Sequence, residues 1–376
     1  MSPRNIAKLH NALPFWISLL LLPLVWISAT AGGWFLLVLP VGVTTIFALI
    51  DRFAGINPDN PDLDATEADL FWYRTITLIW APLQFAMIFS AIWYATRAGH
   101  LGRLEQWGLF ISIGVISGAI GIVYAHELMH QKPKYERTLG DLLMCMTLYG
   151  HFRSEHLLVH HRYVGTPRDP VTARYNEGFH RFFPRVLWQC LISAFNAEKA
   201  MLARKGLPWW HRTNPFWRYW AMEAGLVLLA ALIGGVWGVF LFATQAFFAV
   251  WYLELVNYVE HYGLTRKHLG DGRYEHVKPH HSWNSAHKVS NWLLINLQRH
   301  SDHHYKPERR FPLLQTYHAD DAPQLPGGYP LMTVTAMIPP LWRRMMNPRV
   351  RKWRAMHYPE ITDWAPYKTA TNPLPR

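Results

Sequence analysis

Histidine is the residue type that stands out in this sequence. The chain has 376 residues, and 21 of them are histidine. Nine of these histidines lie in four short clusters, and in three clusters two of them are four residues apart. That spacing places both rings on one face of a helix. The clustered residues are His126 and His130; His156, His160 and His161; His261; and His300, His303 and His304.

Imidazole is a good ligand for iron, zinc, copper and nickel. Two rings four residues apart on a helix can reach the same ion without distorting the backbone. Four ligands fill a structural zinc site, so nine histidines exceed the needs of one metal. They fit two metals, with four or five histidines each. The clusters therefore predict a two-metal centre.

Carboxylates accompany the histidines in each cluster. They are Glu127, Glu155, Glu260 and Asp302. A metal-bound histidine usually donates its second ring N–H to a carboxylate or a carbonyl. We expect these acids to act mainly as such outer partners, and a direct carboxylate ligand remains an open alternative.

Other interpretations of the histidines explain less. The segment from His126 to His130 alone matches the HExxH pattern of zinc proteases, but that class leaves the other seven histidines unexplained. A metal transporter needs ionisable residues deep within its spans, whereas these clusters lie at span ends. The pair His280-His281 lies in a polar loop, and we expect ordinary roles for it and for the rest of the 21 histidines.

Long apolar segments must position these clusters. Charged residues make up only 16% of the chain and hydrophobic residues 51%, against about 25% charged in a soluble domain. The apolar content excludes a disordered chain, and two cysteines exclude a disulfide scaffold. A helix of about 20 apolar residues crosses a bilayer. Six such segments are expected, at about 15–31, 34–50, 71–96, 107–125, 217–233 and 237–256.

The basic residues predict the orientation of these spans. The net charge is +12, and 30 of the 37 Lys and Arg lie in 126–216 and 257–376. Because basic residues next to spans stay in the cytoplasm, we expect both segments to form a cytoplasmic cap that carries the clusters. The charge thus follows membrane sidedness and does not indicate nucleic acid. We expect residues 1–376 to form a single integral-membrane catalytic domain with an all-α fold.

Glu254 is an acid within the last predicted span, seven residues before His261. Asn257, Tyr258 and His261 share its helical face. An ionisable residue inside a span is a functional candidate, so we include Glu254 among the outer partners. The alternative is an interfacial acid paired with a neighbour.

At these motifs the chain resembles the integral-membrane alkane 1-monooxygenases, within the membrane histidine-box di-iron enzymes. The most specific matching strings are Asn257-Tyr-Val-Glu-His-Tyr-Gly-Leu264 and Leu297-Gln-Arg-His-Ser-Asp-His-His304. The string Thr166-Pro-Arg-Asp-Pro170 and the six-span layout extend the resemblance over most of the chain. One departure is Leu158-Val159, where the family usually has a glycine before the His-His pair.

The resemblance implies two non-haem iron ions held by the nine histidines. It also implies that O2 is activated and one oxygen atom is inserted into a terminal C–H bond of a medium-chain n-alkane from the bilayer. Electrons would come from rubredoxin, itself reduced by an NAD(P)H-dependent rubredoxin reductase. The chain has no C-x-x-C pair, so we expect rubredoxin to act in trans. The setting implied is the bacterial inner membrane.

A fatty-acyl desaturase or hydroxylase of the same superfamily is the main alternative, because it would use the same metals on an acyl chain. We also expect an apolar channel between the spans that ends under the metals. A basic face that includes Arg343, Arg344 and Arg351 could steer an acidic redox protein.

Overall fold

The computed structural model describes residues 6–365 and residue 367. Helices make up most of this part of the chain. Two short strands, β1 (His268–Gly270) and β2 (Arg273–Tyr274), pair as an antiparallel hairpin. The helical membrane fold predicted from the hydropathy pattern is therefore confirmed.

Within the described residues, five helical stretches are long and apolar enough to cross a membrane. The first, Leu9–Ala31, joins α2 (Leu9–Ala12), the 3-10 helix η1 (Leu13–Leu20) and α3 (Leu21–Ala31). The second, Gly33–Ala54, joins η2 (Gly33–Leu37), the π-helix η3 (Val38–Val43) and α4 (Thr44–Ala54). The third is α5 (Phe71–Ala95). The fourth, Arg103–Met129, joins α6 (Arg103–Ile116), the π-helix η4 (Ser117–Ile122) and α7 (Val123–Met129).

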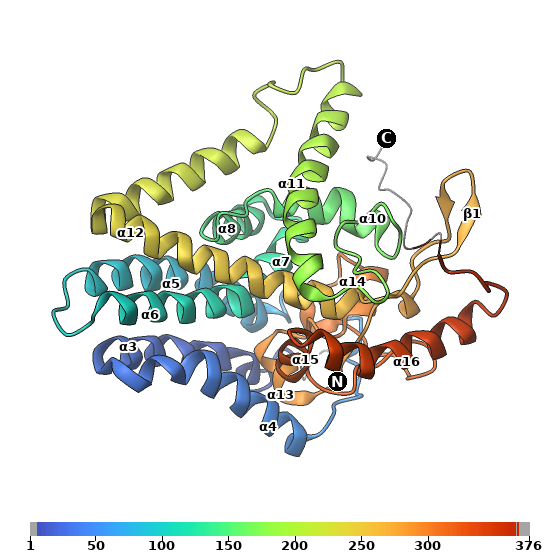
Figure 1. The fold of residues 1–376 in the computed structure, drawn as a ribbon, viewed down its shortest axis with the longest axis horizontal. Coiled ribbons are helices and arrows are strands. Elements are labelled where there is room, and N and C mark those ends of the chain that lie inside the picture. Colours follow the sequence, from blue (N-terminus) through green and yellow to red (C-terminus); the bar gives the residue numbers. More distant parts are fainter. Residues whose placement is uncertain (1–5, 366, 368–376) are drawn as a thin grey trace.

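The fifth stretch, α12 (Phe216–His261), is long enough for two crossings. Its 46 residues would extend about 69 Å as one straight helix, more than twice the roughly 30 Å of a bilayer core. Gly235 breaks the helix with φ 60° and ψ −155°, a conformation that glycine adopts without a Cβ clash. Figure 1 shows α12 folding back on itself. Its two halves correspond to the segments predicted at 217–233 and 237–256.

Close packing against the second half of α12 fixes the fourth span. A Cβ added at Gly114 would lie 2.6 Å from the carbonyl oxygen of Gln245, and one at Gly118 would lie 2.6 Å from that of Ala249. The two glycines are four residues apart and therefore share a helix face. They let the two backbones approach, as small residues do between membrane helices. This contact holds the end of α7 beside the end of α12.

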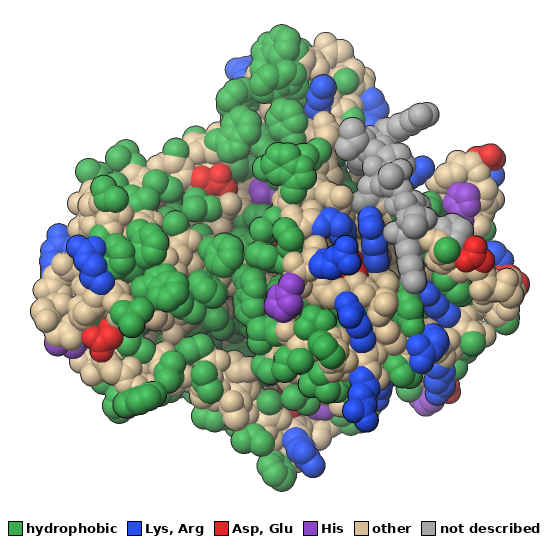
Figure 2. All heavy atoms as spheres, viewed as in Figure 1, with side chains coloured by type: hydrophobic (Ala, Val, Ile, Leu, Met, Phe, Trp, Pro, Cys, Tyr) green, Lys and Arg blue, Asp and Glu red, His purple; other side chains and the backbone are tan. Residues whose placement is uncertain are grey.

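The remaining elements gather at one end of the spans. Helix α11 runs across the direction of the spans, whereas α16 lies at the opposite side of that end (Figure 1). Apolar side chains cover the spans, and Lys and Arg side chains gather over α16 (Figure 2). These elements are α8 (Lys134–Cys145), α9 (Phe152–Glu155), η5 (His156–His160), α10 (His161–Tyr163), α11 (Phe179–Ala203), η6 (Pro279–His281), α13 (Lys288–Leu293), α14 (His300–Tyr305), η7 (Phe311–Leu313), α15 (Tyr329–Ala336) and α16 (Pro339–His357).

Candidate metal centre

The structure brings all nine clustered histidines together in two adjacent groups. In each group, every histidine has a ring nitrogen within 4.8 Å of a ring nitrogen of each other member. They come from the ends of α7 and α12, from η5 and α10, and from α14. The first group is His126, His130, His156, His161 and His303, and the second is His160, His261, His300 and His304.

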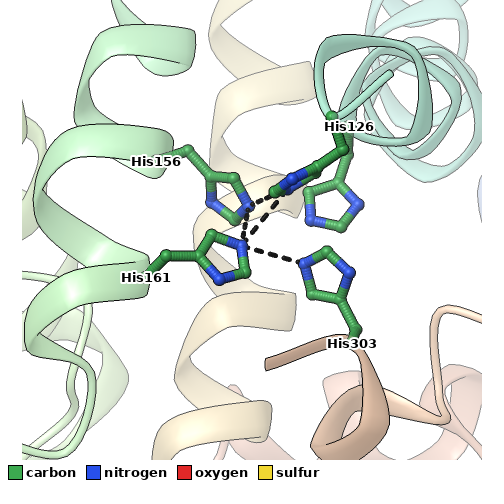
Figure 3. Close-up of side chains that lie close together, drawn as sticks. His126, His156, His161 and His303 are labelled. Atoms are coloured by element: carbon green, nitrogen blue, oxygen red, sulfur yellow. Dashed lines mark hydrogen bonds between the residues drawn. The ribbon is translucent and has the colours of Figure 1, made fainter. Parts of the chain in front are cut away.

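In the first group the rings converge on their Nε2 atoms. The Nε2 of His161 lies 3.2 Å from that of His130, 3.0 Å from that of His156 and 3.0 Å from that of His303. His126 completes the group, and its buried Nε2 has no hydrogen-bond partner among the described residues. Figure 3 shows these rings pointing toward one another from three segments of the chain.

The second group is built in the same way around His304. Its Nε2 lies 3.2 Å from that of His160, 3.1 Å from that of His261 and 3.0 Å from that of His300. All four rings are buried. The group therefore joins the end of α12 to η5 and α14.

Neighbouring histidines divide between the groups because the local helix is a π-helix. The i,i+4 spacing predicts that His156 and His160 reach one ion, but the structure separates them. The turn η5 holds about one extra residue, so His156 and His161 point the same way and His160 points to the second group. In α14, the i,i+4 pair His300 and His304 stays together as predicted.

The short distances between the Nε2 atoms are those expected when the lone pairs of the rings face one cation. A ring nitrogen carries either one proton or one lone pair, so the Nε2 of His161 or His304 cannot form hydrogen bonds with three neighbours at once. Imidazole nitrogens that bind an ion from about 2.1 Å, at roughly right angles to one another, lie about 3 Å apart. The separations of 3.0–3.2 Å match that spacing.

Burial keeps these rings in the form that binds metal. Desolvation lowers the pKa of His130, His156 and His161 well below the usual value for histidine. It does the same to the pKa of His303 and His304. Neutral imidazole offers the lone pair that a metal needs, so both groups are ready to bind cations at neutral pH.

Two rings of the second group have hydrogen-bond partners on Nδ1. His160 Nδ1 donates to Asp169 Oδ2 at 3.0 Å, and His261 Nδ1 donates to the carbonyl oxygen of Asn257 at 2.9 Å. Such bonds fix the ring and its tautomer. His300 Nδ1 lies 3.3 Å from Glu260 Oε1, with no hydrogen bond between the two atoms. The sequence reasoning did not single out Asp169, although the Thr-Pro-Arg-Asp-Pro string contains it.

Glu127 and Asp302 hold neighbouring loops. Glu127 accepts from Gln131 Nε2 at 3.0 Å and from the backbone N–H of Phe311 at 3.2 Å. Asp302 accepts from the backbone N–H of Gln315 at 2.9 Å and also binds Arg309 and Tyr317. Both acids lie between two histidines on a helix, so their side chains point away from the metal-facing side.

Two other acids lie buried behind the groups. Glu254 accepts from Tyr149 Oη and from Asn257 Nδ2, both at 3.0 Å. Glu254 and Asn257 therefore lie on one face of α12, as expected. The backbone carbonyl of Asn257 in turn accepts from His261 Nδ1. Glu155 lies next to the Cys190 thiol, and burial raises the pKa of its carboxyl well above the usual value.

A narrow apolar cavity reaches both groups from between the spans. It has a volume of about 30 Å³, enough for about one or two water-sized molecules. His126 and His156 of the first group and His300 of the second line it. The rest of its lining is Gly118, Ile122, Val123, Phe152, Leu253, Val256, Asn257, Glu260 and Leu297.

Glu275, His280 and His281 form a further group of close polar atoms. Both ring nitrogens of His281 have hydrogen-bond partners in the protein. Its Nδ1 accepts from the backbone N–H of Lys278 at 2.9 Å, and its Nε2 lies 2.6 Å from Tyr358 Oη. This hydrogen bonding fits the structural role expected for the His280-His281 pair.

A bundle of membrane helices with two histidine groups at one end is the architecture of the histidine-box membrane proteins. The fatty acid desaturase family model matches residues 102–336 of the chain.

Curated relatives narrow this class. The chain is 38% identical to alkane 1-monooxygenase 2 of Pseudomonas aeruginosa over 362 residues, which cover 95% of this chain and 93% of the relative. It is 37% identical to alkane 1-monooxygenase 2 of Alcanivorax borkumensis, covering 92% of both chains. It is 40% identical to alkane 1-monooxygenase 1 of Pseudomonas aeruginosa, covering 84% of this chain and 83% of the relative. The chain belongs to the alkane 1-monooxygenase family.

This membership supports alkane hydroxylation by a multi-pass membrane monooxygenase of the non-haem iron type.

Proposed function

We propose that this protein converts medium-chain n-alkanes to 1-alkanols at a histidine-ligated di-iron centre. One iron would be held by His126, His130, His156, His161 and His303. The other would be held by His160, His261, His300 and His304. The convergence of nine ring nitrogens in two adjacent groups supports this assignment most strongly. When bound, the two irons would supply the activation of O2 and the transfer of one oxygen atom to a C–H bond.

The cavity supports attack at the end of an alkyl chain. It is lined by His126, His156 and His300, and its small volume admits a methyl group more readily than the middle of a chain. A second apolar cavity, lined by Ala119, Ile120 and Tyr252 among others, follows the same η4 segment. An alkane that enters from the bilayer could place its remaining carbons along this segment. Exclusion of water by the apolar walls would protect the reacting species.

The surrounding residues hold the centre in place. We propose that Asp169 and Glu260 orient His160 and His300, and that Glu254 acts on His261 through Asn257. Glu127 and Asp302 would keep the loops at 311 and 315 closed over the histidines. Buried carboxylates, Asp169 among them, would offset part of the charge of two iron ions.

Rubredoxin in trans, reduced by an NAD(P)H-dependent rubredoxin reductase, is the electron donor we propose. The histidine end would face the cytoplasm of a bacterial inner membrane, because most Lys and Arg lie there. The basic surface over α16 (Figure 2) would steer an acidic donor toward this end. A rate that hardly changes with ionic strength would count against steering.

Rubredoxin-coupled turnover with alkanes of several lengths, together with iron counted per chain, tests this proposal. We expect two irons per chain and 1-octanol from octane. Conversion of a fatty acyl substrate, with no product formed from the alkanes, would favour the alternative, a desaturase or acyl hydroxylase. Zinc without iron would reject the di-iron centre.

Leu253→Ala tests the cavity separately. Leu253 lines it, so its truncation should shift the preferred alkane toward longer chains. Leu228→Ala is the matched control, because Leu228 is exposed on the first half of the same helix. The same chain-length profile in both variants would remove the cavity from the substrate path.

A further inference from the structure

A cavity much larger than those described above lies on the side of η5 that faces away from the metal groups. It has a volume of about 480 Å³, within the usual range for small-molecule sites. Four basic residues line it, from α8, α9 and α12, and one acid, Glu198, lines it from α11. The basic residues are Lys134, Arg137, Arg153 and Arg218. We call this space the basic cavity.

Positive charge in the basic cavity is only partly neutralised. Arg153 and Arg218 share one buried carboxylate, that of Asp141. Within the described residues, Lys134 and Arg137 form no ion pair. Burial raises the pKa of the Glu198 carboxyl, which accepts from Ser154 Oγ at 2.6 Å. The basic cavity therefore has excess positive charge and fits an anion.

The basic cavity lies at the depth where spans enter the membrane. Helix α8, which carries Lys134 and Arg137, begins five residues after the fourth span ends at Met129. Arg218 is the third residue of α12, the helix that opens the fifth stretch. Cations at this depth stand where lipid phosphates lie.

Apolar and aromatic neighbours favour an amphiphile over a soluble anion. Leu157, Leu158 and Met201 line the basic cavity beside its cations. Exposed tryptophans lie before and within the first turns of α12, as is typical of a membrane interface; they are Trp209, Trp210, Trp217 and Trp220. Helix α11, which lies across the spans (Figure 1), exposes Trp188 and Leu191, as an interfacial helix does.

We propose that the basic cavity binds the phosphate group of an anionic phospholipid, with Lys134 and Arg137 as its free cations. The acyl chains would lie against α11 and the first half of α12. Leu157 and Leu158 belong to η5, so the lipid contacts the back of the segment that carries His156 and His160.

Native mass spectrometry of the full-length protein tests this proposal. Wild-type protein should retain phosphatidylglycerol in preference to phosphatidylcholine, and added salt should weaken the retention. The Lys134→Gln/Arg137→Gln variant should bind phosphatidylglycerol roughly 30-fold more weakly, since each cation near an anionic membrane surface contributes about fivefold. The control Lys132→Gln/Arg344→Gln removes the same charge from exposed sites outside the cavity and should bind as the wild type does.

Other outcomes would overturn the proposal. Equal retention of phosphatidylglycerol by both double variants would place the lipid elsewhere. Glycerol phosphate that binds as tightly as the whole lipid would identify a soluble phosphate ester. Weaker rubredoxin binding by Lys134→Gln/Arg137→Gln, with the lipid retained, would make the basic cavity a donor-docking site. Should the double variant fail to fold, Lys134→Gln alone, at an exposed position, tests the same point with about a fivefold loss.

Discussion

Asp169 gives the sharpest test of the second histidine group. Its Oδ2 accepts from His160 Nδ1 at 3.0 Å and from Thr172 Oγ1 at 2.6 Å, while its Oδ1 accepts from the backbone N–H of Val171 at 3.0 Å. Asp169→Asn keeps the shape of the side chain but leaves one acceptor oxygen for these three donors. At least one buried donor then faces an amide NH2 group.

The expected loss can be estimated from this geometry. A buried donor without its acceptor costs about 1–3 kcal/mol, and loss of an outer partner to a metal ligand typically weakens metal binding about 10–100-fold. Among the nine histidines of the described structure, only His160 forms a hydrogen bond with Asp169. The loss should therefore fall on the second group and spare the first.

Iron counted per chain after dialysis against graded chelator measures this difference. Wild-type protein should hold two irons, and Asp169→Asn should fall to one at a chelator concentration that leaves the wild type intact. Asp51→Asn is the matched control: this buried acid accepts from the backbone N–H groups of Val289 and Ser290 through one oxygen, which asparagine keeps. Iron retained by Asp169→Asn as by the wild type, or both irons lost together, would refute the reasoning.

Further predictions concern the partition and the packing. His160→Ala should perturb one iron and His161→Ala the other, so their Mössbauer spectra should differ; identical spectra would contradict the partition. Gly118→Val should lower the melting temperature in detergent, because its Cβ would lie 2.6 Å from an α12 carbonyl oxygen, an overpacking that costs about 1–3 kcal/mol; an unchanged melting temperature would argue against this contact. Arg310→Met should destabilise the protein by about 1.5–3 kcal/mol in denaturant titration, because buried Glu136 loses a bidentate partner at 3.0 and 3.2 Å and keeps only Arg74 as a charged partner, at 2.8 Å. Arg310→Lys should recover only part of that stability, and full recovery would argue against the paired contact.

Hydropathy predicted the spans well because their apolar runs are long. It placed the first and fourth spans about four to six residues short, since His10 and Arg103 lie in helical segments that extend past the apolar core. It also separated the two halves of α12 at Gly234-Gly235, where the structure has its kink.

The sequence predicted which nine histidines come together, but it did not predict which of them belong to each group. Spacing arguments assume an α-helix, and the residue types in His156-Leu-Leu-Val-His160 do not predict a π-helix. The role of Asp169 was not predicted, because its contact with His160 depends on how a loop folds back onto η5. Such contacts are set by tertiary structure, which periodicity does not describe.

The ligands are spread widely along the chain, and this has a consequence for biosynthesis. The first group takes its earliest member, His126, from the fourth span and its last, His303, from a helix near the far end of the cap. Between His126 and His304 the ribosome adds 178 residues, which at roughly 5–20 residues per second takes about 10–35 s. Neither group is complete during that interval, although four spans have already been made. Iron loading must therefore follow membrane insertion, and the nascent protein must pass through a metal-free stage with its early histidines unassembled.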